Sequence, residues 1–174
     1  YQGFYLDTSG TAGNPITFVA EGLAQITSDN PTTPDGINIE GADHVLIEGF
    51  VVNGRSRAGI RAVLCDHVTI RGNALDANER WGILTGFCDD LLIERNVASN
   101  SVVEHGIYVS NSGDRPIIRG NLLHGNAANG IHMNGDVSLG GDGVISQALV
   151  EDNVIFDNGT AGGSGINGDG VQGS

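Results

Sequence analysis

The sequence predicts an all-β solenoid, a rod of short stacked coils, and three observations lead to this fold class. First, Gly-Ile steps recur at intervals of 23, 23, 24, 24 and 35 residues, with glycines at Gly36, Gly59, Gly82, Gly106, Gly130 and Gly165. Second, apolar and polar residues alternate after each step, without a helical period. Third, 28 glycines among 174 residues indicate many tight turns. A repeat of this length stacks each unit only on its neighbours.

Composition narrows the possible classes of protein. Apolar residues make up 39% of the chain, which suits a narrow continuous core. No apolar run approaches the ~20 residues that a membrane-spanning helix needs, so no membrane span is predicted. The net charge of -13 argues against a nucleic-acid partner, because phosphate binding favours a basic surface.

Each coil is predicted to contain three short strands. The first begins at the Gly-Ile step, and its side chains alternate between the core and the outside. The predicted inward positions are Ile37 and Ile39; Ile60, Ala62 and Leu64; Ile83, Thr85 and Phe87; Ile107 and Val109; and Ile131 and Met133. A second strand is predicted at 45–47, 68–70, 91–93, 116–118 and 148–150, and a third runs through Val52, Leu75, Val97, Leu122 and Val154.

An asparagine recurs at one position after the second strand. The row contains Asn73, Asn96, Asn121 and Asn153, with Phe50 in the corresponding place of the earliest full repeat. Side-chain amides stacked in this way link successive turns, and asparagine tolerates the left-handed backbone that such turns use.

These repeats resemble the right-handed parallel β-helix family, the architecture of pectate-lyase-like proteins. The resemblance covers roughly residues 36–170, and residues 10–17 resemble the coil that often precedes such repeats. One domain over 1–174 is expected, with a first coil at 1–35, regular coils at 36–164, an insertion at about 136–147 and an incomplete coil at 165–174. The family includes polysaccharide lyases, glycoside hydrolases, uronate epimerases and non-catalytic adhesins, so the resemblance alone does not decide the function.

Some polar rows are expected to be structural. The position after the second strand alternates in charge, and it reads Glu48, Arg71, Glu94, Arg119 and Glu151. With coils ~4.8 Å apart, each arginine would lie between two carboxylates, which predicts an ion-pair ladder that sets register.

Two further rows have alternative interpretations. Cys65 and Cys88 occupy the same position in adjacent coils, so they are expected to be neighbours. They could be two buried thiols or a disulfide, and their parallel Cβ directions favour two thiols. Asp43, Asp66 and Asp89 also occupy equivalent positions. Each carboxylate is expected to accept a hydrogen bond from the backbone of its own turn, or, alternatively, the three together hold a calcium ion.

A basic and aromatic group remains after these rows are set aside. It contains Arg55, Arg57, Arg61, Arg80 and Trp81. Arg57 and Arg80 occupy the same position in adjacent coils, so an anion between them would relieve their repulsion. A guanidinium group is suited to bind a carboxylate, and the Trp81 ring is suited to stack on the face of a sugar. Alternatively, Glu79 and Glu104 absorb the charge.

A second group follows the later Gly-Ile steps. The outward row reads Asn38, Arg61, Leu84, Tyr108, His132 and Asn167. Tyr108 and His132 are therefore predicted to be neighbours one coil apart, with His105, Ser110, Asn134 and Asp136 nearby. The longer fifth repeat places residues 136–143 beside the same face, and an insertion in one repeat marks the binding side of a solenoid.

These residue types fit chemistry on uronic-acid polysaccharides. Abstraction of the C5 proton needs a base, a neutralised carboxylate and an acid. Tyr108 and His132 are the candidate acid–base pair, the pairing that several lyases and C5-epimerases of the resembling family use, and Arg61 or Asn134 would bind the carboxylate. The chain has no lysine, unlike the β-helix lyases with a lysine base. Alternatively, Tyr108 and His132 only stack on each other.

The leading hypothesis is therefore a secreted, extracellular or cell-surface lyase or C5-epimerase that acts on an acidic polysaccharide. The candidate substrate-binding residues are Arg57, Arg61, Arg80, Trp81, His105, Asn134 and Asp136. Glycan hydrolysis by Asp136 and Asp142, or glycan binding alone, is a second reading. A non-catalytic adhesin, spike or filament subunit is a third, because the last coil has no capping repeat and its strand edges would allow end-to-end self-association, unless more chain follows.

Overall fold

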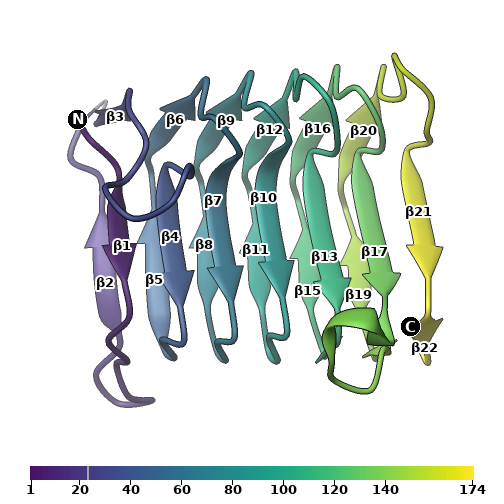
Figure 1. Cartoon of the computed structure of the whole chain (residues 1–174), viewed down its shortest axis with the longest axis horizontal. Coiled ribbons are helices and arrows are strands. Elements are labelled where there is room, and N and C mark those ends of the chain that lie inside the picture. The colour runs from purple at the N-terminus through teal and green to yellow at the C-terminus, as the bar shows by residue number, and fades with distance from the viewer. Residues whose placement is uncertain (23) are drawn as a thin grey trace.

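The computed structural model describes residues 1–22 and 24–174, which form a right-handed single-stranded parallel β-helix. Figure 1 shows the coils stacked side by side, from the purple N-terminal coil to the yellow C-terminal one. Each coil adds a strand to each long sheet, and every pairing between named strands is parallel. The predicted fold class is confirmed.

The first sheet begins each coil and carries the surface described below. Its strands, in spatial order, are β1 (Phe4–Leu6), β4 (Ile37–Glu40), β7 (Ala58–Val63), β10 (Trp81–Gly86), β13 (Ile107–Asn111), β17 (Ile131–Gly135) and β21 (Ile166–Asp169).

The other sheets close the coil. The second contains β2 (Ile16–Val19), β5 (Val45–Glu48), β8 (Thr69–Arg71), β11 (Leu92–Glu94), β15 (Ile117–Arg119) and β19 (Leu149–Glu151). The third contains β3 (Gln25–Ile26), β6 (Val51–Asn53), β9 (Ala74–Asp76), β12 (Val97–Ser99), β16 (Leu122–His124) and β20 (Val154–Phe156). A short fourth sheet contains β14 (Gly113–Asp114), β18 (Ile145–Ser146) and β22 (Val171–Gln172).

The Gly-Ile steps set the register of the first sheet. The isoleucines of successive steps pair in one row, namely Ile37, Ile60, Ile83, Ile107, Ile131 and Ile166. All but the last of these side chains are fully buried. Because a one-residue slip would bring this row to the surface, the apolar alternation fixes the register.

Two of the predicted inward positions are wrong. Leu64 is 58% exposed, and Phe87 is only partly buried. Both residues follow the last strand residue closely and have positive φ angles of 57° and 54°. The chain therefore turns at these positions, and the inward alternation ends before them.

The predicted asparagine ladder is present. Asn96 Oδ1 accepts hydrogen bonds from the backbone N–H and the side-chain amide of Asn73, while its own amide donates to Ile70 O and Asn121 Oδ1. The row continues to Asn153 and begins at the backbone N–H of Phe50, which donates to Asn73 Oδ1. Each of these amides, of which Asn73, Asn96 and Asn121 are buried, thus joins neighbouring coils.

A second asparagine ladder follows the third strand. Asn126 is fully buried, and its amide donates to Ala98 O and Asn158 Oδ1. Asn78 and Asn158 make the corresponding bonds in other coils, and Ser101 takes the position between Asn78 and Asn126. This row is not evident in the sequence, because Ser101 interrupts the asparagines.

The charged ladder on the second sheet has the predicted register. Glu48, Arg71, Glu94, Arg119 and Glu151 pair in sequence. Arg71 Nη2 lies 2.7 Å from Glu48 Oε2, and Arg71 Nη1 lies 4.0 Å from Glu94 Oε1. Arg119 Nη2 lies 2.9 Å from Glu94 Oε2. These contacts support a structural role for both arginines.

The aspartate row bonds differently from the expectation. Asp43 Oδ1 accepts a hydrogen bond from the backbone N–H of Asp66. In the following coils, Asp66 Oδ1 accepts from the N–H of Asp89, and Asp89 Oδ1 accepts from the N–H of Asp114. Each carboxylate therefore bonds the next coil and not its own turn, because the stacking places that N–H within 3.0 Å.

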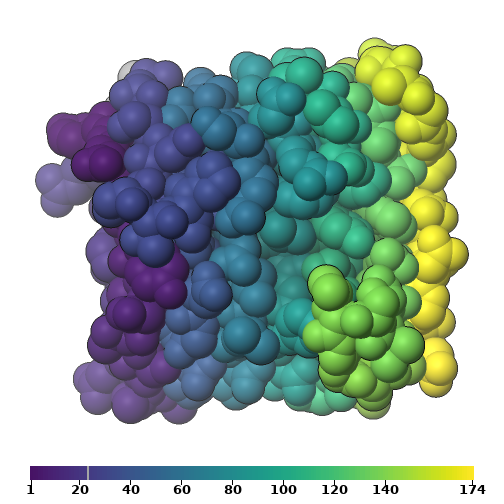
Figure 2. Space-filling view, in the orientation of Figure 1, coloured from purple at the N-terminus to yellow at the C-terminus, as the bar shows by residue number. Residues whose placement is uncertain are grey.

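The longest repeat extends outward as a short 3-10 helix, η1 (Val137–Leu139). Asp136 caps it and accepts a hydrogen bond from the backbone N–H of Ser138. Figure 2 shows this segment, in green, standing out from the face that carries the first sheet. In the part of the chain that the structure describes, no helix has the length and apolar character that a membrane crossing needs.

Candidate functional site

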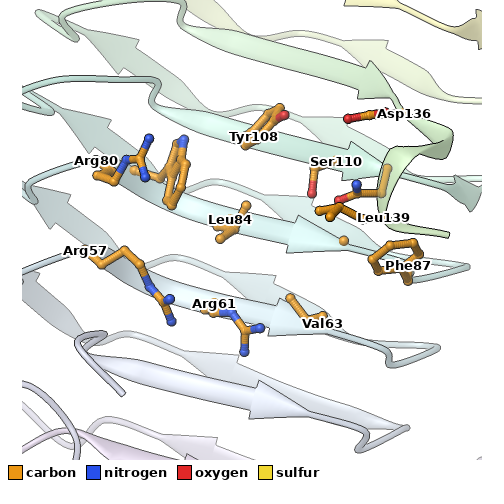
Figure 3. Close-up of a pocket in the computed structure, with 13 residues that line it drawn as sticks. Arg57, Arg61, Val63, Arg80, Leu84, Phe87, Tyr108, Ser110, Asp136 and Leu139 are labelled. Carbon is orange, nitrogen blue, oxygen red and sulfur yellow. The ribbon is translucent and has the colours of Figure 1, made fainter. Parts of the chain in front are cut away.

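A groove of about 350 Å³ lies over the first sheet, beside η1. Its lining comes from β7, β10 and β13, the residues that precede or follow them, and the insertion (Figure 3). The lining residues are Arg57, Arg61, Val63, Arg80, Trp81, Leu84, Gly86, Phe87, Tyr108, Ser110, Asn111, Asp136 and Leu139.

Strand register explains why these residues meet. Arg61, Leu84 and Tyr108 occupy one outward row, since β10 pairs with both β7 and β13. Arg57 and Arg80 sit just ahead of these strands, and the backbone N–H of Arg80 donates to Arg57 O. The groove therefore gathers residues that lie about one coil apart in sequence.

Every arginine in the lining is paired with a carboxylate. Arg57 donates through Nε to Asp35 Oδ1 at 2.9 Å, and the Asp35 side chain is fully buried. Arg80 donates to Glu104 at 2.8 Å. Arg57 and Arg80 thus pair with separate carboxylates of the protein: Glu104 neutralises Arg80, as in the alternative interpretation, while Arg57 pairs with Asp35 of the first coil.

The third pair lies deeper in the outward row. Arg61 Nη1 donates to Glu40 Oε2 at 2.5 Å and to Asn38 Oδ1 at 2.9 Å. Asn38 is consequently buried, although its row faces outward, because the arginine covers it. Burial alone would raise the pKa of Glu40, but hydrogen bonds from Arg61 and Asn38 outweigh it and hold that pKa below its ordinary value.

Asp35 was not identified from the sequence. It stands directly before Gly36, and its partner Arg57 follows 22 residues later, one residue less than a full coil. The contact is therefore diagonal between coils, whereas the sequence analysis compared only positions of equal phase. The same hydrogen bond raises the pKa of Arg57, so this guanidinium stays charged.

An aromatic stack forms one side of the site. The rings of Trp81 and Tyr108 are stacked with centroids 5.8 Å apart, and Tyr108 and His132 continue the stack at 5.0 Å. The guanidinium of Arg80 lies 4.6 Å from the Trp81 ring centre. Trp81 is only 8% exposed, so its ring face is not available for sugar stacking; its buried Nε1 has no hydrogen-bond partner within the described chain.

A chain of imidazoles extends from the aromatic stack into the protein. The backbone N–H of Asn129 donates to His105 Nδ1 at 3.1 Å, so the proton of neutral His105 resides on Nε2. His105 Nε2 then donates to His132 Nδ1 at 3.0 Å, which leaves the proton of neutral His132 on its own Nε2. That atom is 3.7 Å from Asp169 Oδ2. The Nε2 atom of His132 is itself buried and has no hydrogen-bond partner among the described residues, so the chain of imidazoles ends inside the protein.

The environment keeps His105 uncharged. The pKa of His105 is lowered to about 4, mainly by burial and then by the nearby His132, with a further contribution from Arg80. The carboxylate of Glu104 acts in the opposite direction but does not outweigh them. His105, His132 and Asn134 all lie outside the groove lining, next to Tyr108. The predicted neighbours Tyr108 and His132 are indeed paired across β13 and β17.

The remaining predicted residues have defined partners. Asn134 Nδ2 donates to the Tyr108 hydroxyl at 3.2 Å, and Ser110 Oγ donates to Thr85 O. Asp136 holds the first turn of η1, and hydrogen bonds from Ser138 lower its pKa. Asp142 accepts the backbone N–H of Val144. Both candidate carboxylates for hydrolysis are thus engaged in their own loop.

Arg55, the last arginine of the predicted basic group, is not part of the groove lining. It is 8% exposed and donates to Asp29 Oδ1 and to Thr27 O, which ties it to the first coil. Within the described residues, no group of three or more histidine, cysteine, aspartate or glutamate side chains converges as a metal site would.

One protein family and two solved structures are similar to this chain. The sequence profile of a family described as periplasmic copper-binding protein (NosD) matches residues 2–170. No curated protein matches the chain. Among solved structures, pectate lyase Pel9A is similar at a TM-score of 0.61 and 16% identity, over 91% of this chain and 42% of the lyase. The chain thus spans less than half of that enzyme, and the likeness shows the fold.

A second solved structure is an alginate lyase from Paenibacillus sp. str. FPU-7. Its TM-score is 0.37 at 16% identity, over 97% of this chain and 87% of the lyase.

The family description raises the question of copper, for which imidazole and thiolate are suitable ligands. The His105–His132 pair does not fit a copper ion as it stands, since the free lone pair of each neutral ring already accepts a hydrogen bond, from Asn129 N–H and from His105. His44 and His67 stack face to face, with 7° between their planes, so their in-plane lone pairs do not converge on one ion between the rings. No chemical step is assigned to copper here.

Proposed function

Because the chain belongs to the NosD family, whose members are described as periplasmic copper-binding proteins, we propose a function outside the cytoplasm, namely the binding of a polysaccharide in the groove over the first sheet. The likeness to a pectate lyase supports a carbohydrate ligand by analogy of fold. The site, however, has to carry the argument.

The observation that carries the proposal is a groove rich in hydrogen-bond donors whose charge is already balanced. Each of Arg57, Arg61 and Arg80 engages a carboxylate through part of its guanidinium and retains further N–H groups. Those N–H groups are available to the oxygen atoms of an uncharged ligand.

Sugar hydroxyls suit such a surface. They accept hydrogen bonds from guanidinium N–H groups, and the apolar side chains of Leu84 and Leu139 offer contact to the C–H face of a ring. The lining residues come from three successive coils, with η1 on one side, so we infer that the ligand lies across several coils, as a linear chain of sugars can (Figure 3).

Charge decides between neutral and acidic polysaccharides. Asp35, Glu40 and Glu104 neutralise the arginines, and the whole chain carries -13. A polyanion would have to displace these carboxylates or approach against the overall field. The primary proposal is therefore a neutral or weakly acidic glycan.

Lyase or C5-epimerase action on a uronic-acid polysaccharide is the second candidate, and the position of Tyr108 favours it. The Tyr108 hydroxyl belongs to the groove lining and accepts from Asn134, so its own proton is free for transfer to a leaving oxygen. In this candidate His132 supports the Tyr108 ring by stacking on it, and Arg61 binds the substrate carboxylate. For the step to balance, Tyr108 would first take the C5 proton as a phenolate and would then, as the phenol formed in this way, give a proton to the leaving oxygen, so that one residue acts as base and acid in turn.

One experiment tests both candidates with the full chain. Affinity electrophoresis against pectate, alginate and neutral glucans and galactans measures binding, while ultraviolet absorbance of the unsaturated product and NMR of epimer content measure turnover. Retardation by a glycan that weakens at least tenfold in Arg61→Gln supports the groove, and Arg119→Gln on the second sheet is the matched control. Retardation unchanged by Arg61→Gln, or none at all, contradicts it.

Turnover separates the second candidate from the first. If the chain is a lyase or epimerase, product forms and Tyr108→Phe lowers kcat by at least a hundredfold while binding persists. Binding without product supports glycan binding alone. Product formation that survives Tyr108→Phe would remove Tyr108 from the chemistry.

A further inference from the structure

Cys65 and Cys88 lie against each other inside the solenoid. Their Sγ atoms are 3.0 Å apart, and the residues are 1% and 2% exposed. Both are free thiols in this structure. Cys88 Sγ also lies 3.2 Å from Gly86 O and 3.4 Å from Ala62 O. The sequence analysis favoured separate thiols because parallel Cβ directions hold sulfur atoms apart, but here the two sulfurs converge.

The strand register brings the pair together. Val63 of β7 pairs with Gly86 of β10, and each cysteine follows two residues later, so Cys65 and Cys88 form adjacent rungs. Equivalent rungs of parallel coils are ~4.8 Å apart, which falls within the Cα separations that disulfides span. The rungs on either side are Ala42 and Gly113, so no bulky side chain separates or crowds the sulfurs.

We propose that Cys65 and Cys88 form a disulfide between neighbouring coils when the chain folds in an oxidising compartment, by exchange with the disulfide of a thiol oxidoreductase or of oxidised glutathione. The family description places members in the periplasm, a compartment where disulfides persist.

The exchange balances in two steps. The thiolate of one cysteine attacks the oxidant's disulfide and releases one thiol of the oxidant. The second cysteine, as thiolate, then attacks the mixed disulfide, closes the Cys65–Cys88 bond and releases the other thiol. The two cysteines lose two electrons and two protons, and the oxidant's disulfide is reduced to two thiols.

The two exchange steps take place at different stages of folding. The hydrogen bond to Cys88 and burial raise the pKa of Cys65, so this thiol forms little thiolate in the folded chain, and the burial of both sulfurs excludes a bulky oxidant. The first exchange therefore takes place before the two coils close, and the second when stacking brings the sulfurs together.

The bond would act at one end of the groove. Val63, Gly86 and Phe87 line the groove within two residues of a cysteine. The bond links residues 23 apart, one full coil, and thereby fixes the ends of β7 and β10 relative to each other. Closing such a loop stabilises the fold mainly by restricting the unfolded chain.

The test is refolding of the full chain in a mixture of oxidised and reduced glutathione, followed by alkylation with N-ethylmaleimide in denaturant and intact-mass measurement. We expect a monomer with no alkylated cysteine. Its melting temperature should exceed that of the reduced chain by about 5–10 °C. Two alkylated cysteines, or disulfide-linked dimers, would overturn the proposal.

The Cys65→Ala/Cys88→Ala double variant is the matched control, because alanine already occupies the equivalent rung at position 42. Its melting temperature should be the same in the oxidised and reduced mixtures. A wild-type chain that also melts at one temperature in both mixtures, or melts lower when oxidised, would contradict a stabilising bond even if the bond forms.

Discussion

His105 and His132 share a hydrogen bond of 3.0 Å, from the Nε2 of the first ring to the Nδ1 of the second. The backbone N–H of Asn129 fixes the proton positions in both rings, because it occupies His105 Nδ1. His132 in turn stacks on Tyr108, which lines the groove. A buried neutral imidazole therefore supports the aromatic stack from behind.

This relationship predicts how stability changes with pH. The pKa of His105 is about 4 in the folded chain against an ordinary value of 6.5. As the pH falls through 6.5, the unfolded chain binds the proton first, so the free energy of unfolding decreases until the pH reaches about 4. The titration of His105 alone lowers the free energy of unfolding by about 3 kcal/mol. This decrease is complete below pH 4 and absent above pH 6.5.

Urea unfolding of wild type and His105→Asn between about pH 4 and pH 7 measures that loss. Asparagine can still accept the Asn129 N–H but does not titrate. The variant should show a shallower decline over this window, and the difference between the two curves isolates His105 from other titrating groups. Parallel curves would mean that His105 is not held neutral.

Removal of Arg57 should destabilise the fold. Its partner Asp35 has a fully buried side chain, which also accepts the Ala58 N–H, and loss of the cation leaves a buried carboxylate uncompensated. We expect Arg57→Met to lower the free energy of unfolding by about 3 kcal/mol. Arg71→Met, in an exposed pair, should cost less than about 1 kcal/mol. Equal losses in chemical denaturation would contradict this distinction.

Substitution of Asn96, at the centre of the asparagine ladder, should also lower the free energy of unfolding. Asn96→Ala leaves the N–H of Asn73 and the carbonyl of Ile70 buried without their partners. The expected loss is about 3 kcal/mol. Asn167→Ala provides the comparison, since that amide lies on the outer row and donates only to Asp169, and its loss should stay below about 1 kcal/mol. The midpoints of thermal unfolding report both.

The isoleucine row allows a comparison within one structural position. Ile83 is fully buried and Ile166 is 49% exposed, although both belong to the isoleucine row of the first sheet. Ile83→Ala should lower the free energy of unfolding by about 3–4 kcal/mol through the cavity it leaves. Ile166→Ala should cost about 1 kcal/mol or less. A comparable loss at Ile166 would show that another chain segment covers this end in solution.

The sequence predicted the solenoid and the positions of equal phase because a strand period of two and a constant coil length determine which residues stack. Asn96 and Asn121, Glu48 and Arg71, and the adjacent Tyr108 and His132 could all be read in this way. Such inferences depend only on counting residues between Gly-Ile steps.

Contacts between different phases could not be read from the repeat. Arg57 reaches Asp35 diagonally, and Arg80 covers the ring of Trp81, so both depend on side-chain rotamers. The inward direction of His105 likewise follows from the turn before Gly106 and not from strand alternation. The sequence offered Glu104 as a partner for Arg80, but the pairing of Arg57 with Asp35, and with it the full charge balance of the groove, required the structure.

Fluorescence of Trp81 during titration with oligosaccharides tests the central claim most directly, because the chain has one tryptophan and it lines the groove. The account predicts a saturable change in emission with a neutral or weakly acidic glycan, an apparent Kd at least tenfold weaker in Arg61→Gln, and an unchanged Kd in Arg119→Gln. Emission that stays constant for every glycan, or an equal Kd in the wild type and Arg61→Gln, would contradict glycan binding in the groove.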